Sequence, residues 1–330
     1  MVNFTLIIMM VLVSVLLAFA IGANDETFST VIGVKRLSIK AAVIMGAIIA
    51  IIGAFIFAPK VCETLHNDIT SLDIVQDRTI FSIFLAMATS LILASVFGLP
   101  ISSTEAMVGS ILGLTFALGG KVNWGITGMG KVFITWITSP LLGLTGSFLL
   151  MKLTNCVLTK KVNGLRALET SNEIFGVLLL GMVIITGLSR AGNDISNAIA
   201  PIVPLFQKED SSIFYERLPM ILGGAGLGLG LIVIGRRVLD TLGNEVVELT
   251  PESAFVTEGA AAIIVLVAVN LGIPVSGTLT LVSSFVGAGL GMNKPINLKT
   301  IRAIVLFVFL TPIISGGGAI GFYYLLGLVF

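Results

Sequence analysis

The chain has 330 residues, of which 56% are hydrophobic and 11% charged, with 19 Lys and Arg against 18 Asp and Glu. A soluble domain carries about 25% charged residues, so this composition excludes a soluble enzyme, a nucleic-acid-binding protein and a disordered chain. The apolar runs are continuous rather than alternating, which excludes a transmembrane β-barrel. The composition therefore predicts an all-α polytopic membrane protein.

A membrane-spanning helix needs about 20 apolar residues, and several stretches approach or exceed this length. They occupy residues 2–21, 39–57, 80–97, 132–151, 174–188, 218–234, 254–271 and 301–329. Two more apolar stretches, 99–118 and 273–290, contain Pro, Ser, Thr and many Gly, which predicts broken or re-entrant helices. No Lys or Arg precedes the first span, as a cleaved signal peptide would require, so we expect this span to be retained.

Four sequence blocks recur in the same order in the second half of the chain. The clearest pair is 98–113 with 272–287, in which 7 of 16 positions are identical at an offset of 174. The other pairs, at nearly the same offset, are 24–25 with 193–194, 60–69 with 237–246, and 139–140 with 311–312. Such a duplication predicts two structural repeats.

An odd number of membrane elements in each repeat would give the second repeat the opposite orientation. We therefore predict two inverted-topology repeats of about five elements each, with broken or re-entrant helices and 10–12 membrane elements in all. The first repeat would cover residues 1–160, a cytoplasmic linker 161–172, and the second repeat 173–330. The distribution of Lys and Arg favours an N-terminus on the outside.

Asn24, Asp25 and Glu26 directly follow the first apolar span. A charge in a spanning helix costs at least about 2.5–3.5 kcal/mol on insertion scales, so adjacent carboxylates need a wet cavity, a cation or a helix end. The pairs Asn24-Asp25 and Asn193-Asp194 either mark interfacial helix ends or build a cation site twice, and their recurrence favours the cation site. The candidate cation ligands are Asn24, Asp25, Glu105, Asn193 and Asp194.

Hydroxyl side chains follow Pro100, and the second block repeats this pattern after Pro274. Proline is favoured in the first turn of a helix, where free N–H groups and the helix dipole attract anions. The alternative is that these hydroxyls bond to carbonyls and pack helices, but the duplication favours an anion site. The candidate anion ligands are Ser102, Ser103, Thr104, Ser276, Gly277 and Thr278, together with Asn24 and Asn193.

Other residues point less clearly to a role. Arg190 either attracts anions or pairs with an acid, and the GxxxG spacings within residues 223–230 predict close helix packing. Cys62 and Cys156 lack CxxC spacing, so we expect two separate thiols rather than a disulfide or metal pair. A single histidine, His66, argues against a histidine-based metal site or catalytic triad.

At these motifs the chain resembles the inorganic phosphate transporter family, the sodium- or proton-coupled phosphate permeases. That family carries a GANDVANA-like signature and a GLPVSTTH-like block in each half. Here the signatures read GANDETFS at 22–29 and AGNDISNA at 191–198, and the blocks read GLPISSTE at 98–105 and GIPVSGTL at 272–279. The resemblance spans essentially the whole chain and implies a prokaryotic member without the large central loop of animal members.

The resemblance implies a secondary active transporter, not an enzyme, that imports inorganic phosphate by alternating access around a midplane site. Asp25 and Asp194 would be the essential acids, and the Ser/Thr blocks would hold phosphate. The family histidine is replaced by Glu105 and Leu279, which favours sodium as the co-transported ion and the only metal, with no cofactor. A proton symporter, a transporter of another tetrahedral oxyanion such as sulfate, and an anion channel stay open as alternatives.

Coupling is also expected on energetic grounds. Importing a divalent anion against 100 mV, inside negative, costs about 2 × 2.3, or roughly 4.6 kcal/mol. The expected partners are therefore inorganic phosphate, sodium ions and the lipid bilayer. A homodimer is a further hypothesis, and no nucleic-acid partner is expected. The expected location is the cell membrane (inner or plasma), as a multi-pass protein.

Overall fold

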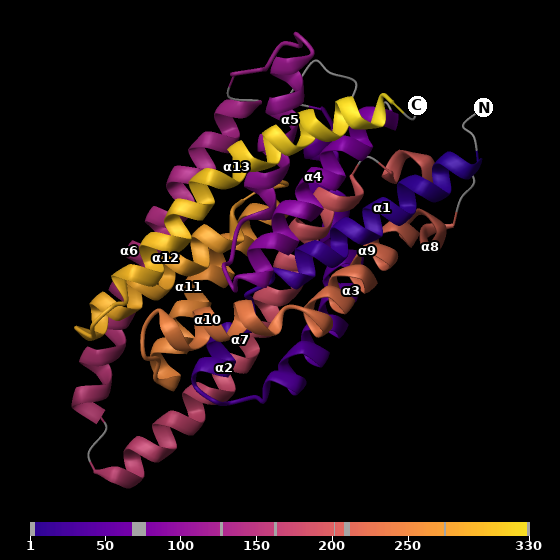
Figure 1. Ribbon diagram of the computed structural model, residues 1–330. Helices are drawn as coiled ribbons and strands as arrows, with labels where there is room; N and C mark the ends of the chain where they lie inside the picture. The colour runs from indigo at the N-terminus through magenta and orange to yellow at the C-terminus, as the bar shows by residue number, and fades with distance from the viewer. Residues whose placement is uncertain are drawn as a thin grey trace.

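The computed structural model describes residues 4–67, 77–125, 128–161, 164–200, 202–207, 212–273 and 275–328. Within these ranges the regular elements are α-helices and one short 3-10 helix, packed into one elongated body (Figure 1). The all-α membrane architecture predicted from the composition is confirmed.

The helices fall into two series of the same order. The first series is α1 (Phe4–Ala23), α2 (Ser29–Gly33), α3 (Ile39–Asn67), α4 (Asp77–Val96), α5 (Ser103–Ala117) and α6 (Met129–Lys161). The second is α7 (Leu165–Ile199), η1 (Val203–Phe206), α8 (Ile213–Glu216), α9 (Leu218–Val233), α10 (Arg236–Glu245), α11 (Pro251–Asn270), α12 (Gly277–Met292) and α13 (Leu298–Leu326).

Among the described residues, six helices are long and apolar enough to cross a membrane. The pair α9 and α10 adds a seventh candidate, bent by 65°, while α1 and α12 are shorter apolar helices. Residues 165–172 of the expected linker form the first turns of α7. Helix-favouring residues there extend the apolar span beyond the hydrophobic run that predicted it.

The two halves are interlocked rather than side by side. Helix α12 packs along α6, and its counterpart α5 packs along α13. Likewise α1 packs against α9, and α3 against α7 (Figure 1). Each contact is repeated with the halves exchanged, which is the pattern of a pair of inverted repeats.

The glycine-rich helix α9 lies between α1 and α3 and presents a different GxxxG pair to each. A Cβ on Gly226 would lie 2.8 Å from the Val15 carbonyl oxygen of α1, and one on Gly230 would overlap the Phe19 carbonyl. On the other side, a Cβ on Gly224 would lie 2.7 Å from the Cα of Ile51 in α3. The predicted packing role of these glycines is therefore confirmed.

Candidate functional site

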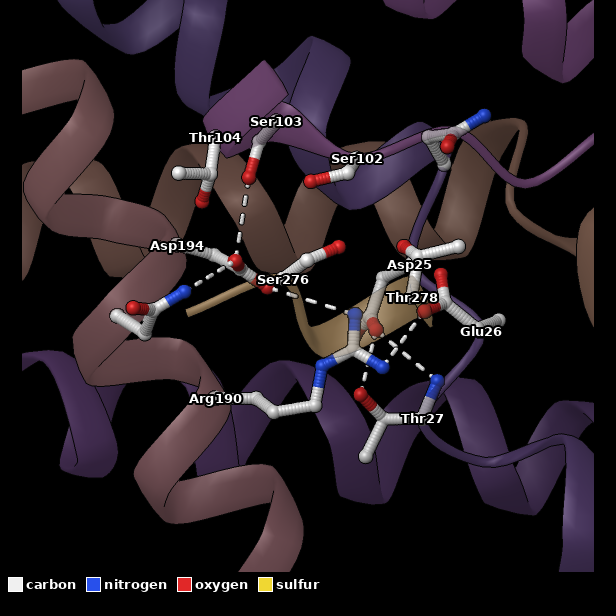
Figure 2. Close-up of polar contacts among 12 residues, drawn as sticks. Asp25, Glu26, Thr27, Ser102, Ser103, Thr104, Arg190, Asp194, Ser276 and Thr278 are labelled. Atoms are coloured by element: carbon white, nitrogen blue, oxygen red, sulfur yellow. Dashed lines mark hydrogen bonds and ion pairs between the residues drawn. The ribbon is translucent and has the colours of Figure 1, made fainter. Parts of the chain in front are cut away.

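The first Asn-Asp signature lies where the backbone leaves the helix. Helix α1 ends at Ala23, and α2 begins at Ser29. In the loop, Asp25 Oδ1 accepts hydrogen bonds from the Thr27 amide at 3.0 Å and the Thr27 hydroxyl at 2.5 Å (Figure 2). A carboxylate that bonds the amide two residues later stabilises a turn in competition with the helix. The backbone between α1 and α2 is therefore held by local turns rather than by a continuous helix.

The second signature stays helical. Helix α7 continues through Asn193 and Asp194 to Ile199. This copy therefore does not mark the end of a helix, which was one of the two hypotheses from the sequence. Asp194 Oδ1 accepts from Asn193 Nδ2 at 3.1 Å and from the Ser103 hydroxyl at 3.2 Å. Asn197 donates to the same hydroxyl at 3.1 Å. The second signature thus binds the hydroxyl block of the first half.

Both hydroxyl blocks follow a helix that ends at a left-handed glycine. Gly98 has a φ of +70° after α4, and Gly272 has a φ of +66° after α11. Such a glycine ends a helix without the strain that a Cβ would add. The glycine in each block is therefore the stop signal of the preceding helix, and the hydroxyls belong to the next helix.

Serine, not proline, begins each of these next helices. The Ser102 hydroxyl accepts from the Glu105 amide at 3.4 Å at the start of α5, and Ser276 accepts from the Leu279 amide at 3.2 Å at the start of α12. We expected proline in the first turn; instead Pro100 lies two residues before the capping serine, because the serine satisfies a free amide. Pro274 lies outside the described residues.

The asparagines of the two signatures hold the extended segments ahead of α5 and α12. Asn24 Oδ1 accepts from the Ile101 amide at 2.7 Å, and Asn193 Oδ1 accepts from the Val275 amide at 3.3 Å. Asn24 also donates to the Leu99 carbonyl at 3.0 Å. The structure therefore gives Asn24 and Asn193 a positioning contact with the backbone, in addition to their expected place among the ligands.

The threonines of the two blocks reach across to each other's backbone. Thr104 donates to the Val275 carbonyl, and Thr278 donates to the Ile101 carbonyl, both at 3.4 Å. The N-termini of α5 and α12 therefore meet at the centre of the molecule, each with free amide groups and the positive end of its dipole. The blocks predicted to hold an anion are brought together from the two halves.

Arg190 is the basic residue at this meeting point. Its guanidinium forms an ion pair with Glu26 at 2.7 Å and a longer one with Asp194 at 3.7 Å, and all three side chains are at most 9% exposed (Figure 2). It also lies against the first residue of α12, since a Cβ on Gly277 would be 2.8 Å from Arg190 Nε. Arg190 thus pairs with acids, which was one of the two hypotheses from the sequence. It also lies beside Gly277, one of the expected anion ligands.

Two more buried acids lie close by. Neither carboxylate oxygen of Glu105 has a hydrogen bond with good geometry, although Ser276 lies near enough to interact with it. Glu258 accepts from the Thr30 hydroxyl at 2.7 Å and leaves its other oxygen without a partner among the described residues. Glu258, Thr30 and Asn197 are not among the residues predicted from the sequence; an acid inside the apolar stretch 254–271 was the available signal for Glu258.

A small cavity lies between the two signatures and the two hydroxyl blocks. Its volume is about 10 Å³, room for about one water molecule. Among its lining residues are seven of the predicted site: Asn24, Asp25, Ser102, Ser103, Asp194, Gly277 and Thr278. Glu26 and Arg190 also line it. An ion as large as phosphate requires the surrounding helices or side chains to move apart.

Comparison with known proteins identifies the family of the chain. The model of the phosphate transporter family matches residues 21–319. A protein of Thermococcus kodakarensis named "Putative phosphate permease" is 29% identical, over 89% of this chain and 91% of its own. A protein of the same name from Chlamydia trachomatis is 26% identical, over 95% of this chain and 96% of its own.

A solved structure, "The sodium-dependent phosphate transporter", has the same fold. It matches with a TM-score of 0.85 and 21% identity, covering 99% of this chain and 100% of the other. Family match, similar relatives and shared fold agree over nearly the full length. The chain belongs to the phosphate transporter family.

Proposed function

We propose that this phosphate transporter imports inorganic phosphate across the cell membrane by symport with sodium ions. The observation that carries the proposal is the meeting of the α5 and α12 N-termini beside Arg190 and the buried acids. Helix N-termini and hydroxyls bind a tetrahedral oxyanion without a further buried positive charge. The anion would lie between the two halves, and each half could release it in turn.

The charge balance of the site supports cation coupling. Asp25, Glu26 and Asp194 face a single guanidinium. Two like unit charges 4 Å apart repel by about 4 kcal/mol at an effective dielectric constant of about 20. A phosphate dianion added to this cluster is therefore unfavourable unless cations arrive with it, which is the physical requirement for symport.

Sodium suits the oxygen atoms that the first signature offers. The loop after α1 combines the Asp25 carboxylate and the Thr27 hydroxyl with the carbonyls of a backbone segment that is not helical. Unwound backbone at the middle of a membrane is a recurring sodium-coordinating element in transporters. We therefore propose the Asp25 loop as a sodium site and Asp194 as its counterpart in the second half.

Proton coupling is the second candidate, and one observation favours it. Glu105 stands where the family block has histidine, and both its oxygens are buried without a well-formed hydrogen bond. A buried carboxyl of this kind avoids a large desolvation cost by carrying a proton. Glu105 would then exchange protons during the transport cycle.

The test is uptake of radiolabelled phosphate into proteoliposomes with the two gradients imposed separately. We expect an inward sodium gradient to drive accumulation, also when the pH gradient is collapsed. Excess sulfate should inhibit uptake only weakly. Accumulation driven by pH alone in sodium-free buffer would contradict sodium coupling and establish the proton symporter. Equal inhibition by sulfate and by unlabelled phosphate would contradict phosphate selectivity.

A further inference from the structure

The ion pair between Arg190 and Glu26 joins the two halves at the cavity. Arg190 belongs to α7 of the second half, whereas Glu26 belongs to the loop after α1 of the first. Their closest atoms are 2.7 Å apart, and the side chains are 5% and 1% exposed. Asp194, the other acid near this guanidinium, is 1 Å farther away, at 3.7 Å. Glu26 is therefore the principal partner of Arg190.

The same guanidinium is placed to bind a different anion. It lies against Gly277 at the start of α12 and lines the cavity with Ser103 and Thr278. A guanidinium binds carboxylate and phosphate oxygens with the same N–H groups. Glu26 contacts Arg190 through one close pair of atoms, Oε1 and Nη1, and a phosphate ion in the cavity would compete for the same guanidinium.

We propose that phosphate displaces Glu26 from Arg190, and that the freed Glu26 carboxylate binds a sodium ion. This inference rests on the proposed function of the site. It assigns to Glu26 the step that couples the two substrates, and it makes Arg190 a phosphate ligand. Asp194 stays beside Arg190 and is not the group that exchanges.

The surroundings of Glu26 explain why a freed carboxylate needs a cation. The charged groups that face it are Asp25 in its own loop, Arg190 and Asp194 of α7, and Glu105 of α5. Once phosphate holds Arg190, the remaining neighbours of Glu26 are all acids. A buried, unpaired carboxylate among acids is strongly unfavourable, so phosphate binds well only when a cation binds too. By linkage, the cation and phosphate must then raise each other's affinity by the same factor.

The experiment measures phosphate binding to the purified full-length chain by equilibrium dialysis with radiolabelled phosphate. One arm varies sodium at fixed pH, and the other varies pH at fixed sodium. In the native protein we expect tighter binding as the sodium concentration increases. In Glu26→Gln, which has no charge to release, binding at the lowest sodium concentration should tighten at least about tenfold. The slope of log Kd against log sodium concentration should fall by about one, and an unchanged sodium slope with a change only in the pH arm overturns the inference.

Two further variants complete the design. Glu173→Gln removes the acid of an exposed ion pair with Arg36, at 2.8 Å, and should leave affinity and slope unchanged. Glu26→Asp keeps the charge but shortens the reach to Arg190, so it should bind phosphate more tightly than the native protein and keep the slope. This variant still tests the inference if Glu26→Gln does not fold.

The possible results distinguish the exchange at Arg190 from the proposed function of the whole site. If Glu26→Gln binds phosphate with the native slope of log Kd against log sodium concentration, the inference is overturned and the proposed function stands. An unchanged phosphate affinity in Glu26→Asp overturns it as well. A native protein that binds no phosphate in either arm overturns the proposed function itself.

Discussion

The two Asn-Asp signatures share a sequence but not a conformation. The first unwinds after Ala23 and bonds to its own Thr27, whereas the second stays within α7 and bonds to Ser103 of the other half. The duplicated motif has thus taken two forms. The unwound copy is the one that we propose as a sodium site, and the helical copy contacts Arg190 and the first hydroxyl block.

The residues that follow each Asp explain the difference. In the first copy, Thr27 closes a turn onto Asp25, and Phe28 is fully buried in an apolar cluster with residues of α2 and α3. In the second copy, Ser196 bonds back to the Gly192 carbonyl at 2.5 Å within the helix, and Asn197 reaches Ser103. Local side-chain bonding therefore decides which copy leaves the helix.

The largest expected effect tests whether both acids are essential despite these different surroundings. We expect Asp25→Asn and Asp194→Asn each to reduce sodium-driven phosphate uptake by at least about 100-fold. Breaking a buried charge interaction costs about 3–5 kcal/mol, and each 1.4 kcal/mol is a factor of about ten. The measurement is initial uptake in proteoliposomes, with size-exclusion chromatography to confirm folding. Native rates in both variants would refute the cation site.

The second prediction sharpens the comparison between the two hydroxyl blocks, which differ at Ser103 and Gly277. We expect Gly277→Ser to weaken phosphate binding by about 10- to 100-fold, because the new Cβ would lie 2.8 Å from Arg190 Nε and displace the guanidinium. The control is Gly181→Ala on α7, where a Cβ has nothing within 4 Å. Equal affinities in these two variants would mean that the position of Arg190 is unimportant for phosphate.

The third prediction addresses what the two blocks share. Thr104→Val and Thr278→Val should each raise the phosphate concentration for half-maximal uptake by about tenfold. Each substitution keeps the shape and removes a hydroxyl, and a hydrogen bond to a charged group contributes about 1.5–3 kcal/mol. Sodium binding measured without phosphate should change much less. If phosphate affinity stays native in both variants, these hydroxyls only join α5 to α12.

The smallest effect concerns stability. Asn24→Ala and Asn193→Ala each leave one buried amide, of Ile101 or Val275, without its acceptor. An unsatisfied buried donor costs about 1–3 kcal/mol, so both variants should unfold a few degrees below the native protein in a thermal-shift assay. The first bond, at 2.7 Å, is shorter than the second, at 3.3 Å, so Asn24→Ala should lose more. The reverse order would show that the lengths of these two hydrogen bonds do not determine their contributions to stability.

Much of the fold was predictable because membrane insertion imposes long apolar runs. The run at 218–234 matches α9 (Leu218–Val233), and the run at 254–271 matches α11 (Pro251–Asn270). The helix extensions were not predictable in this way. Helix α3 continues through Pro59 to Asn67, and α7 begins within a charged segment at Leu165. Hydropathy marks the membrane-crossing part of a helix, not the polar turns that extend it.

The site was predictable as a set of residues but not as a set of partners. Duplication pointed to the signatures and the hydroxyl blocks, which the structure brings together. It could not indicate that Arg190 pairs with Glu26 from the other half, or that Thr30 bonds Glu258 across 228 residues of sequence. These contacts depend on how the halves interlock, and no local pattern encodes that arrangement.

The crossed packing of α5 on α13 and of α12 on α6 has a consequence for biosynthesis. When the ribosome has completed the first half, the helices that will cover α5 and α6 have not yet been made. Until α12 and α13 have been synthesised, the start of α5, with its hydroxyls and Glu105, lacks the helices that bury it in the finished protein. The two halves are therefore obliged to mature together, and neither half made alone would have a finished interior.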